Sequence, residues 1–505
     1  MGTVKPDDPD YLFDGEGAPD PDVAKLEAKL APLRYQPRAL DATAVVDRVA
    51  TPDHDDAARD ATVADAEAAV AAARRAFDAG VWATDTELRI RCLEQFHAAL
   101  VEHRDELAAL TIAEVGATPA LCQGAQLDQP IEIVRYYADL LKTYPLTEDL
   151  GNIESRGMQH HRWVEKEAGG VVAAIIAYNY PNQLALAKLA PALAAGCTVV
   201  LKSAPDTPLV TLALGELIAK HTDIPAGVVN VLSGADPAVG AALTTSPDVD
   251  MVTFTGSTPT GRAIMREGAA NLKRLTLELG GNDAAIVLPD ADVDAIAPRI
   301  FAAAFGNSGQ VCAAIKRLYV HESVHDALAA RLAEMAAAAT VGAGDDPDSQ
   351  FGPLQNRKQF DYVAALADDA RAAGGRFLTG GTATTGPGYF FPLSVLVDVT
   401  DGVRAVDEEQ FGPILPIVRY HDPEDALARA NANDNGLGGS VWSSDVERAA
   451  ALAQRLQCGS VWVNDHSTIS PTIPFGGAKQ SGIGVEFGQH GLDEYTQLQT
   501  VRIPR

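Results

Sequence analysis

The feature that most constrains the fold is an alternation of short apolar runs and longer helical stretches between residues 169 and 280. The first run, GGVVAAIIA, is apolar throughout, which is typical of a strand buried on both faces of a parallel sheet. Intervening helices supply the crossovers that parallel strands require. We therefore expect strands over Gly169–Ala177, Thr198–Leu201, Val228–Leu232, Met251–Thr255 and Leu275–Leu279, with helices over Asn182–Ala195, Pro208–His221 and Thr260–Ala270.

A second alternation begins near residue 283 and predicts another α/β unit, so the expected fold class is α/β. Before the first sheet, helical patterns cover Thr62–Ala79, Thr86–Ile112 and residues 120–143, and a short helix is expected over Val23–Leu33. In the second unit we expect strands over Ala284–Leu288, Leu318–His321, Leu393–Val399 and Ile414–Val418, with helices near 293–305, 323–339, 355–373 and 424–430.

Residues 152–168 alternate roughly between polar and apolar side chains and are polar overall. This pattern predicts an exposed hairpin whose edge is available for pairing with another subunit.

The charge balance excludes some partners, because 40 Lys and Arg residues face 68 Asp and Glu residues. Such a surface repels nucleic acid and disfavours anionic membranes. The longest apolar runs are too short to span a bilayer, so no membrane partner is expected. The five cysteines are widely spaced without a CxxC pair, and the N-terminus lacks a signal pattern. We expect no disulfide framework, no metal site and a cytoplasmic location.

Three residues could carry covalent chemistry. Cys312 follows a glycine in NSGQVCAA and could attack a carbonyl, although most free cysteines are buried and inert. Glu278 ends the strand pattern LTLE and could act as a base on water, although strand-end glutamates are commonly just solvated. Asn179 could donate its amide NH2 to an oxyanion, or simply cap the following helix.

A second group of residues suits a phosphate-bearing ligand. The segment FTGSTPTG, with Gly256 and Ser257, runs from a strand into a helix whose free N–H groups could hold a pyrophosphate. It could equally be an ordinary strand–helix turn. Lys202 ends another strand, where it could bind ribose or phosphate or be merely solvated. Nothing physical alone marks Glu409 and Phe411, in EEQFGP, as functional.

Taken in order, AYNYP, LAPALAAGCTVVLK, FTGSTPTG, LELGG, NSGQVCAA, EEQFGP and PFGGAKQSGIG resemble the aldehyde dehydrogenase superfamily across about 300 residues. The resemblance implies NAD(P)-dependent oxidation of an aldehyde to a carboxylic acid. Cys312 would be the nucleophile, and Asn179 with the Cys312 backbone N–H would stabilise the oxyanion. Glu278 would be the base that hydrolyses the thioester.

The resemblance also implies cofactor contacts and a proton relay. Lys202 would bind the adenosine ribose region, Gly256 and Ser257 a phosphate, and Glu409 and Phe411 the nicotinamide ribose. Glu486 matches an acidic position linked to proton relay. Many NAD-preferring relatives carry Glu three residues after the lysine, where this chain has Pro205. We expect NAD as cofactor, with NADP also possible.

The substrate implied is a small-molecule aldehyde of medium size, aliphatic or aromatic, because the matching tunnel positions are mostly apolar. Two alternatives remain: a semialdehyde dehydrogenase that passes the acyl group to coenzyme A, and a non-catalytic binding protein on the same fold. Glu278 argues against the first, and the retained Cys312 and Asn179 against the second. The expected tunnel residues are Tyr180, Leu184, Val311, Ala313, Ile473 and Phe475.

The implied architecture is a Rossmann-like cofactor domain, an α/β catalytic domain and a small β oligomerisation hairpin, assembled into a homodimer or homotetramer. The expected boundaries are an N-terminal arm over 1–40, a cofactor domain over 41–149 and 169–280, oligomerisation segments over 150–168 and 481–505, and a catalytic domain over 281–480.

Overall fold

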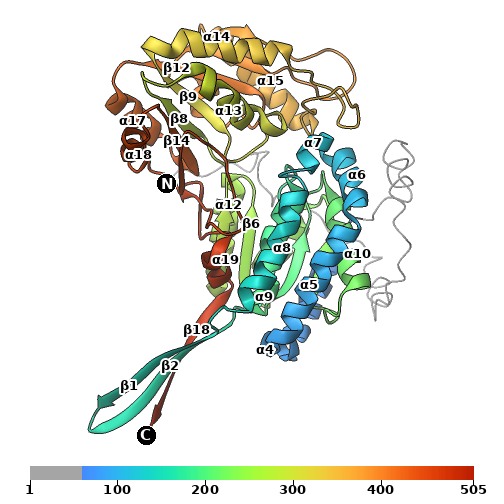
Figure 1. Cartoon of the computed structure of the whole chain (residues 1–505). Helices are drawn as coiled ribbons and strands as arrows, with labels where there is room; N and C mark the ends of the chain where they lie inside the picture. The colour runs from blue at the N-terminus through green and yellow to red at the C-terminus, as the bar shows by residue number, and fades with distance from the viewer. Residues whose placement is uncertain (1–59) are drawn as a thin grey trace, which may run out of the picture.

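The computed structural model describes residues 60–505, so the helix expected over Val23–Leu33 and the N-terminal arm lie outside the described residues. The described chain forms two α/β units, one above the other in Figure 1, and a slender antiparallel arm that projects away from both. The α/β class expected from the alternating pattern is confirmed.

The first unit is built on a six-stranded sheet in the order β17-β7-β6-β3-β4-β5. Its strands are parallel except for β17, which runs antiparallel to β7. Every residue of β3, β4 and β6 is buried, which explains why these strands read as continuous apolar runs. The bounds are β3 (Val171–Ile175), β4 (Thr198–Lys202), β5 (Val229–Leu232), β6 (Met251–Thr255), β7 (Arg274–Glu278) and β17 (Gly482–Ile483).

Helices cover both faces of this sheet. Because α9 is apolar on nearly all sides, it is buried along almost its whole length. The crossover helices are α9 (Pro181–Ala195), α10 (Pro208–His221), α11 (Pro237–Thr245) and α12 (Thr258–Gly268), of which α11 was not expected from the sequence. The preceding helices are α3 (Val63–Asp78), α4 (Val81–Thr84), α5 (Thr86–Glu102), α6 (Arg104–Val115), α7 (Pro119–Cys122) and α8 (Asp128–Leu141).

The expectation of one helix over Thr86–Ile112 is wrong, because the chain breaks at His103, with φ −99° and ψ 19°. A new helix starts there, and Asp105 and Glu106 lie in its first turn. Carboxylates are favourable at a helix N-terminus, where the backbone N–H groups are free. The apolar period continues across the break, which is why the pattern read as one helix.

The second unit contains a seven-stranded sheet in the order β10-β11-β12-β9-β8-β14-β15, parallel except for β10. Strands β10, β14 and β15 were not predicted. Strand β14 begins with two glycines, which weaken a strand pattern. The strands are β8 (Asp283–Val287), β9 (Ile315–His321), β10 (Arg376–Thr379), β11 (Ser394–Val399), β12 (Ile414–Tyr420), β14 (Gly438–Trp442) and β15 (Ser460–Val463), and the main helices are α13 (Val293–Phe305), α14 (Glu322–Ala338), α15 (Arg357–Ala372), α17 (Pro423–Ala432) and α18 (Val446–Ala453).

The projecting arm contains the predicted hairpin, formed by β1 (Thr147–Ser155) and β2 (Met158–Ala168). The C-terminal strand β18 (Thr496–Pro504) pairs with the other edge of β2, so the arm is a three-stranded antiparallel sheet. Among the described residues, the outer edges of β1 and β18 have no neighbouring strand.

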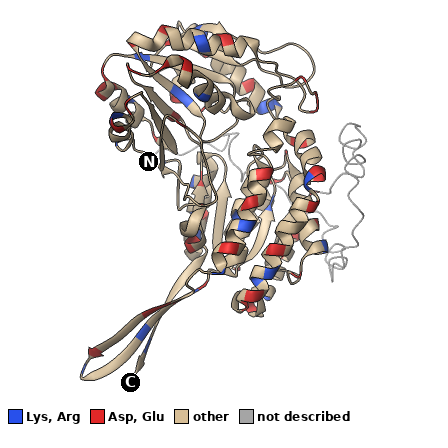
Figure 2. Cartoon of the chain, viewed as in Figure 1, with Lys and Arg blue, Asp and Glu red and all other residues tan. Residues whose placement is uncertain are grey.

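No helix among residues 60–505 is both long and apolar enough to cross a membrane. Figure 2 shows that acidic and basic residues are scattered along the outer helices in this view, including α5, α6 and α8.

Candidate active site

A cavity of about 860 Å³ lies where the two units meet, at the carboxyl ends of the first sheet. The last residues of four parallel strands line it: Ile175 of β3, Lys202 of β4, Thr255 of β6 and Glu278 of β7. This is where open parallel sheets bind ligands, because the strand ends and the following helix N-termini expose polar backbone groups. The volume is toward the upper end of the range for small-molecule sites, about 300–1,000 Å³.

Cys312 reaches this cavity from a tight loop that follows α13. A short 3-10 turn, Gly306–Gly309, contains Asn307 and Ser308 in the left-handed region, at φ 50° and 55°. The Ser308 hydroxyl donates to the Gly352 carbonyl at 2.6 Å, which anchors the turn. The Cys312 side chain is partly exposed and lines the cavity. The loop therefore presents a thiol on a backbone held by specific hydrogen bonds.

Asn179 lines the same cavity and is tied to the Cys312 loop. Its side-chain NH2 donates to the Gln310 backbone carbonyl at 3.0 Å. The backbone carbonyl of Asn179 accepts from the Gln126 and Asn307 side-chain amides at 2.8 and 3.1 Å. An amide NH2 has two hydrogens, so one remains for an oxyanion in the cavity. The Asn179 side chain is thus oriented as a donor next to the thiol.

Glu278 lines the cavity opposite these groups, and neither of its carboxylate oxygens has a hydrogen-bond partner among the described residues. Burial raises the pKa of Glu278 well above its usual value, the Glu486 carboxylate raises it further, and the Lys188 ammonium opposes them. A carboxyl group that is buried, unpaired and raised in pKa is the form expected of a general base.

The thiol of Cys312 is also held in its neutral form. Burial raises the pKa of Cys312 to about 12, and the carboxylates of Glu278 and Glu409 add to the rise, while the Lys316 ammonium lowers it. Thiolate is the nucleophile, so the reaction needs proton removal from this thiol.

Behind Glu278, a buried ion pair joins Lys188 of α9 to Glu486, and the Lys188 ammonium also donates to the Thr255 hydroxyl at 2.8 Å. Glu486 is buried and does not line the cavity, whereas Thr255 does. Lys188 was missed by sequence reasoning. The sequence feature that could have identified it is a single lysine inside the apolar run LALAKLAPALAA. A lysine buried on all sides needs an acidic partner.

At the other end of the cavity lie Lys202, Gly256 and Ser257. The Lys202 ammonium donates to the Ser203 and Gly234 carbonyls at 3.1 and 3.0 Å, and burial lowers its pKa. Ser257 is the N-cap of α12, whose first turn opens onto the cavity. Free N–H groups at a helix start suit a phosphate group.

Asp236 also lies at this end and was missed by the sequence analysis. It is exposed, lines the cavity, and its carboxylate caps α11 by accepting from the Ala238 N–H at 2.8 Å. It comes two residues after Gly234, whose carbonyl binds Lys202. A carboxylate near Lys202, the lysine expected at the adenosine ribose, can accept from ribose hydroxyls and repel a phosphate.

Glu409 and Phe411 approach the cavity from the second unit. A Glu409 oxygen accepts from the Lys316 ammonium at 2.9 Å and from the Gly281 N–H at 3.3 Å. The Lys316 ammonium also lies 5.0 Å from the centre of the Phe411 ring. Lys316, missed from the sequence, therefore holds together both residues expected at the nicotinamide ribose.

Of the expected tunnel residues, Tyr180, Leu184 and Val311 line the cavity, but Ala313, Ile473 and Phe475 do not. Ala313 is fully buried behind the Cys312 loop, where its carbonyl accepts from the Ser467 hydroxyl. Ile473 is 59% exposed on the surface, and Phe475 is buried in the core. Ile469 and Pro471, from the same segment as Ile473, also line the cavity.

The comparisons with known proteins agree with this geometry. A family model described as the aldehyde dehydrogenase family matches residues 40–501. The putative aldehyde dehydrogenase DhaS of Bacillus subtilis is 37% identical over 443 residues, which cover 88% of this chain and 88% of that protein.

Solved structures match over a similar span. The NAD+ complex of an aldehyde dehydrogenase from Bacillus cereus has a TM-score of 0.85 at 36% identity, covering 88% of this chain and 90% of that one. An NADP-dependent enzyme of E. coli has a TM-score of 0.84 at 35% identity, covering 88% and 91%.

Proposed function

The chain belongs to the aldehyde dehydrogenase family, and from that premise we propose how its own residues oxidise an aldehyde to a carboxylic acid. The observation that carries the proposal is that Cys312, Asn179 and Glu278 line one cavity, together with residues that suit a dinucleotide. It is thus an oxidoreductase whose reaction uses a nicotinamide cofactor.

The cavity fits such a cofactor. The start of α12 at Ser257 offers free N–H groups to a pyrophosphate, Lys202 and Asp236 flank a ribose position, and Glu409 offers a carboxylate to a second ribose. When bound there, the nicotinamide accepts the hydride that leaves the substrate carbon.

In the first half-reaction, the Cys312 sulfur attacks the aldehyde carbon and the carbonyl oxygen becomes an oxyanion. The free hydrogen of the Asn179 amide and the Cys312 backbone N–H donate to this oxygen. The thiol proton is released to water in the cavity, and the Lys316 ammonium favours the thiolate that forms. Loss of hydride then leaves an acyl group on sulfur as a thioester.

In the second half-reaction, Glu278 takes a proton from water, the water oxygen attacks the thioester carbon, and the Cys312 thiolate leaves with release of the acid. We propose that the Lys188–Glu486 pair, through Thr255, receives the proton from Glu278 and returns it to solvent. Because Glu278 activates water, the site favours hydrolysis of the thioester over transfer of the acyl group to coenzyme A.

Replacing Cys312 with Ala tests the covalent mechanism. We expect loss of NAD(P)H production, while binding of NAD, measured by fluorescence titration, stays within about twofold of wild type. Turnover by Cys312→Ala at more than a trace of the wild-type rate would refute thioester chemistry at this residue. The matched control is Cys458→Ala, because Cys458 is a partly exposed free thiol that does not line the cavity.

NAD is the cofactor we propose to be preferred over NADP, although Pro205 stands where many relatives carry an acid. Asp236 supplies a carboxylate at the same end of the cavity, and its charge disfavours a 2′-phosphate. A tenfold preference for NADP in kcat/KM would overturn this choice.

The substrate proposed is a medium-sized aliphatic or aromatic aldehyde. Tyr180, Leu184, Val311, Ile469 and Phe487 give the cavity a largely apolar lining. Gln129 and Gln183, which also line it, are neutral, and the two lysines that line the cavity are Lys202 and Lys358. A panel of aldehydes assayed with both cofactors tests this, and activity confined to charged semialdehydes would contradict it.

The proposed assembly is a homodimer or homotetramer built through the arm, with a cofactor domain over 41–149 and 169–280 and a catalytic domain over 281–480. Exposed apolar side chains on the arm support an interface, among them Met158 and Leu498. A reducing compartment such as the cytoplasm is proposed because all five cysteines are free thiols.

A further inference from the structure

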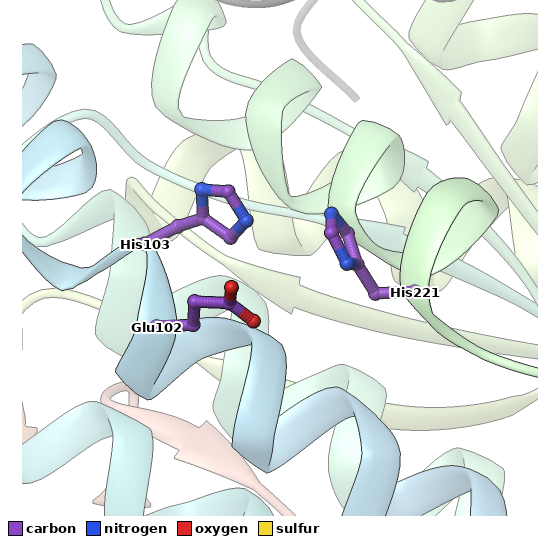
Figure 3. A group of neighbouring side chains, drawn as sticks. All are labelled: Glu102, His103 and His221. Carbon is purple, nitrogen blue, oxygen red and sulfur yellow. The ribbon is translucent and has the colours of Figure 1, made fainter.

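Three side chains of types that commonly bind metal ions lie close together on the first unit, and none of them lines the active-site cavity. Glu102 is the last residue of α5, His103 joins α5 to α6, and His221 is the last residue of α10. One donor atom from each lies within 4.8 Å of the other two. Figure 3 shows the imidazole rings facing each other, with the Glu102 carboxylate beneath and between them. We propose that this cluster binds a divalent transition-metal ion, with Zn²⁺ as the best fit.

The strongest observation concerns the hydrogen bonding of His103. Its Nδ1 lies 3.1 Å from a Glu106 oxygen, and a carboxylate there fixes the proton on Nδ1. The lone pair is then on Nε2, the atom that faces the cluster. This Nε2 is buried and has no hydrogen-bond partner among the described residues. A ligating histidine commonly donates its other N–H to a carboxylate in this way, and Glu106 has that outer role here.

The remaining ligands are free to close around an ion. Glu102 and His221 are both exposed, and neither has a hydrogen bond or ion pair to any residue in 60–505. Tetrahedral ligands at about 2.0 Å from Zn²⁺ lie about 3.3 Å apart, so the cluster must contract by about 1.5 Å. Rotation of two surface side chains supplies this movement without shifting either helix.

The backbone favours a cation at the same place. The cluster lies at the C-terminal ends of α5 and α10, where unpaired carbonyl groups give a helix its partial negative charge. His103 is also the N-cap of α6, whose partial positive charge is offset by Asp105 and Glu106 in its first turn. Glu102 and Glu106 add two carboxylates around the two neutral imidazoles. The local field therefore offsets the charge of a divalent ion.

The donor set decides the kind of ion. Two imidazole nitrogens and one carboxylate oxygen suit Zn²⁺ and its transition-metal neighbours, whereas Mg²⁺ and Ca²⁺ prefer oxygen ligands alone. Water would complete the tetrahedron, since the cluster is at the surface. The bound ion would join the α5–α6 corner to the end of α10 and so stabilise the first unit.

The test is a Zn²⁺ titration of the untagged full-length chain carrying Cys312→Ser, so that the active-site thiol cannot bind the metal. Competition with a chromogenic chelator gives stoichiometry and affinity. We expect one Zn²⁺ per chain that is lost in His103→Gln and in His221→Gln, and binding that is about 10–100-fold weaker in Glu106→Gln. His97→Gln is the matched control, because His97 lies on the same helix but outside the cluster and faces Glu132 at 3.4 Å.

Zinc K-edge X-ray absorption on the Cys312→Ser protein gives a readout that does not depend on the folding of the ligand variants. Two imidazole nitrogens at about 2.0–2.1 Å and no sulfur ligand support the proposal. Sulfur ligation, or Zn²⁺ binding that is unchanged in the His103→Gln, His221→Gln double variant, would overturn it.

Discussion

At the residue scale, burial opposes ionisation of both groups that are proposed to react. Burial raises the pKa of Cys312 to about 12 and that of Glu278 well above its usual value. The thiol must therefore lose a proton before it attacks, and Glu278 is a stronger base than an exposed carboxylate. The Lys316 ammonium lowers the pKa of Cys312, and the Lys188 ammonium lowers that of Glu278. These two buried cations thus partly offset the rise in pKa that burial causes.

Glu278→Gln should separate the two half-reactions. We expect one equivalent of NADH per site in a rapid burst, then a steady state slower by about 10²–10⁴-fold, because the base for thioester hydrolysis is lost. Stopped-flow absorbance and intact-mass detection of the acyl-enzyme check this. In wild type, the ionised fraction of Glu278 grows as pH rises through its raised pKa, so deacylation should accelerate over that range, which lies above the usual range of a carboxyl group. A burst followed by undiminished turnover in Glu278→Gln would contradict the assigned role.

Asp236→Asn should relax cofactor selection. Asparagine keeps a side-chain oxygen that can cap α11 but removes the charge that repels a 2′-phosphate. We expect kcat/KM for NADP to rise about tenfold, equal to about 1.4 kcal/mol, with a smaller change for NAD. Steady-state kinetics with both cofactors measure this. If the ratio of kcat/KM for NADP to that for NAD stays as in wild type, Asp236 does not contribute to cofactor selection.

At the element scale, the active site depends on short irregular segments placed at the ends of regular ones. The turn before Cys312 has consecutive left-handed residues and ends at Gly309, with φ +76°. A Cβ at Gly309 would lie 2.3 Å from the Gly412 carbonyl oxygen. The nucleophile loop and the loop that carries Phe411 are therefore packed backbone against backbone, which fixes the thiol relative to the cofactor residues.

Gly309→Ala should disturb this contact. We expect a larger loss of stability than in the control, because both changes strain a left-handed backbone by about 1–3 kcal/mol but only this one also forces a Cβ against the Gly412 carbonyl. We also expect a loss of turnover because Cys312 moves. Gly374→Ala is the matched control: Gly374 has φ +95°, but its added Cβ would meet nothing within 4 Å. Thermal unfolding and kcat of both variants measure the difference. Equal effects would show that the contact with Gly412 has no separate importance.

At the scale of the whole molecule, the arm is the part that the rest of the chain does not cover. It presents two unpaired strand edges and exposed apolar side chains, a combination that isolated proteins avoid because it promotes edge-to-edge association. The active-site cavity, in contrast, is completed within one chain by residues of both sheets. The proposed association through the arm is therefore not needed to bring the catalytic groups together.

Leu498→Lys should weaken self-association. Leu498 is 69% exposed on β18, and a charge there would be buried unpaired if a second copy covers the strand. We expect light scattering coupled to size exclusion to report a smaller particle than wild type. Leu272→Lys is the control, since Leu272 is 88% exposed but lies outside the arm. An unchanged mass for Leu498→Lys would exclude this part of β18 from the interface.

The sequence by itself determined the parallel strands of the first sheet and the hairpin, and it singled out Cys312, Asn179 and Glu278, which line one cavity. Strand and helix periods are local properties, and the motifs kept their order along the chain, so both could be recognised without coordinates. The single helix over Thr86–Ile112 was wrong because an apolar period can continue across a break in the backbone.

Only the tertiary structure decided which distant groups act together. Lys188 meets Glu486, Lys316 meets Glu409, and His103 meets His221 only because separate elements pack against one another. The same packing left Ala313 behind the nucleophile loop and Ile473 on the surface, away from the cavity. Burial and charge pairing depend on neighbours in space, which no periodicity along the chain records.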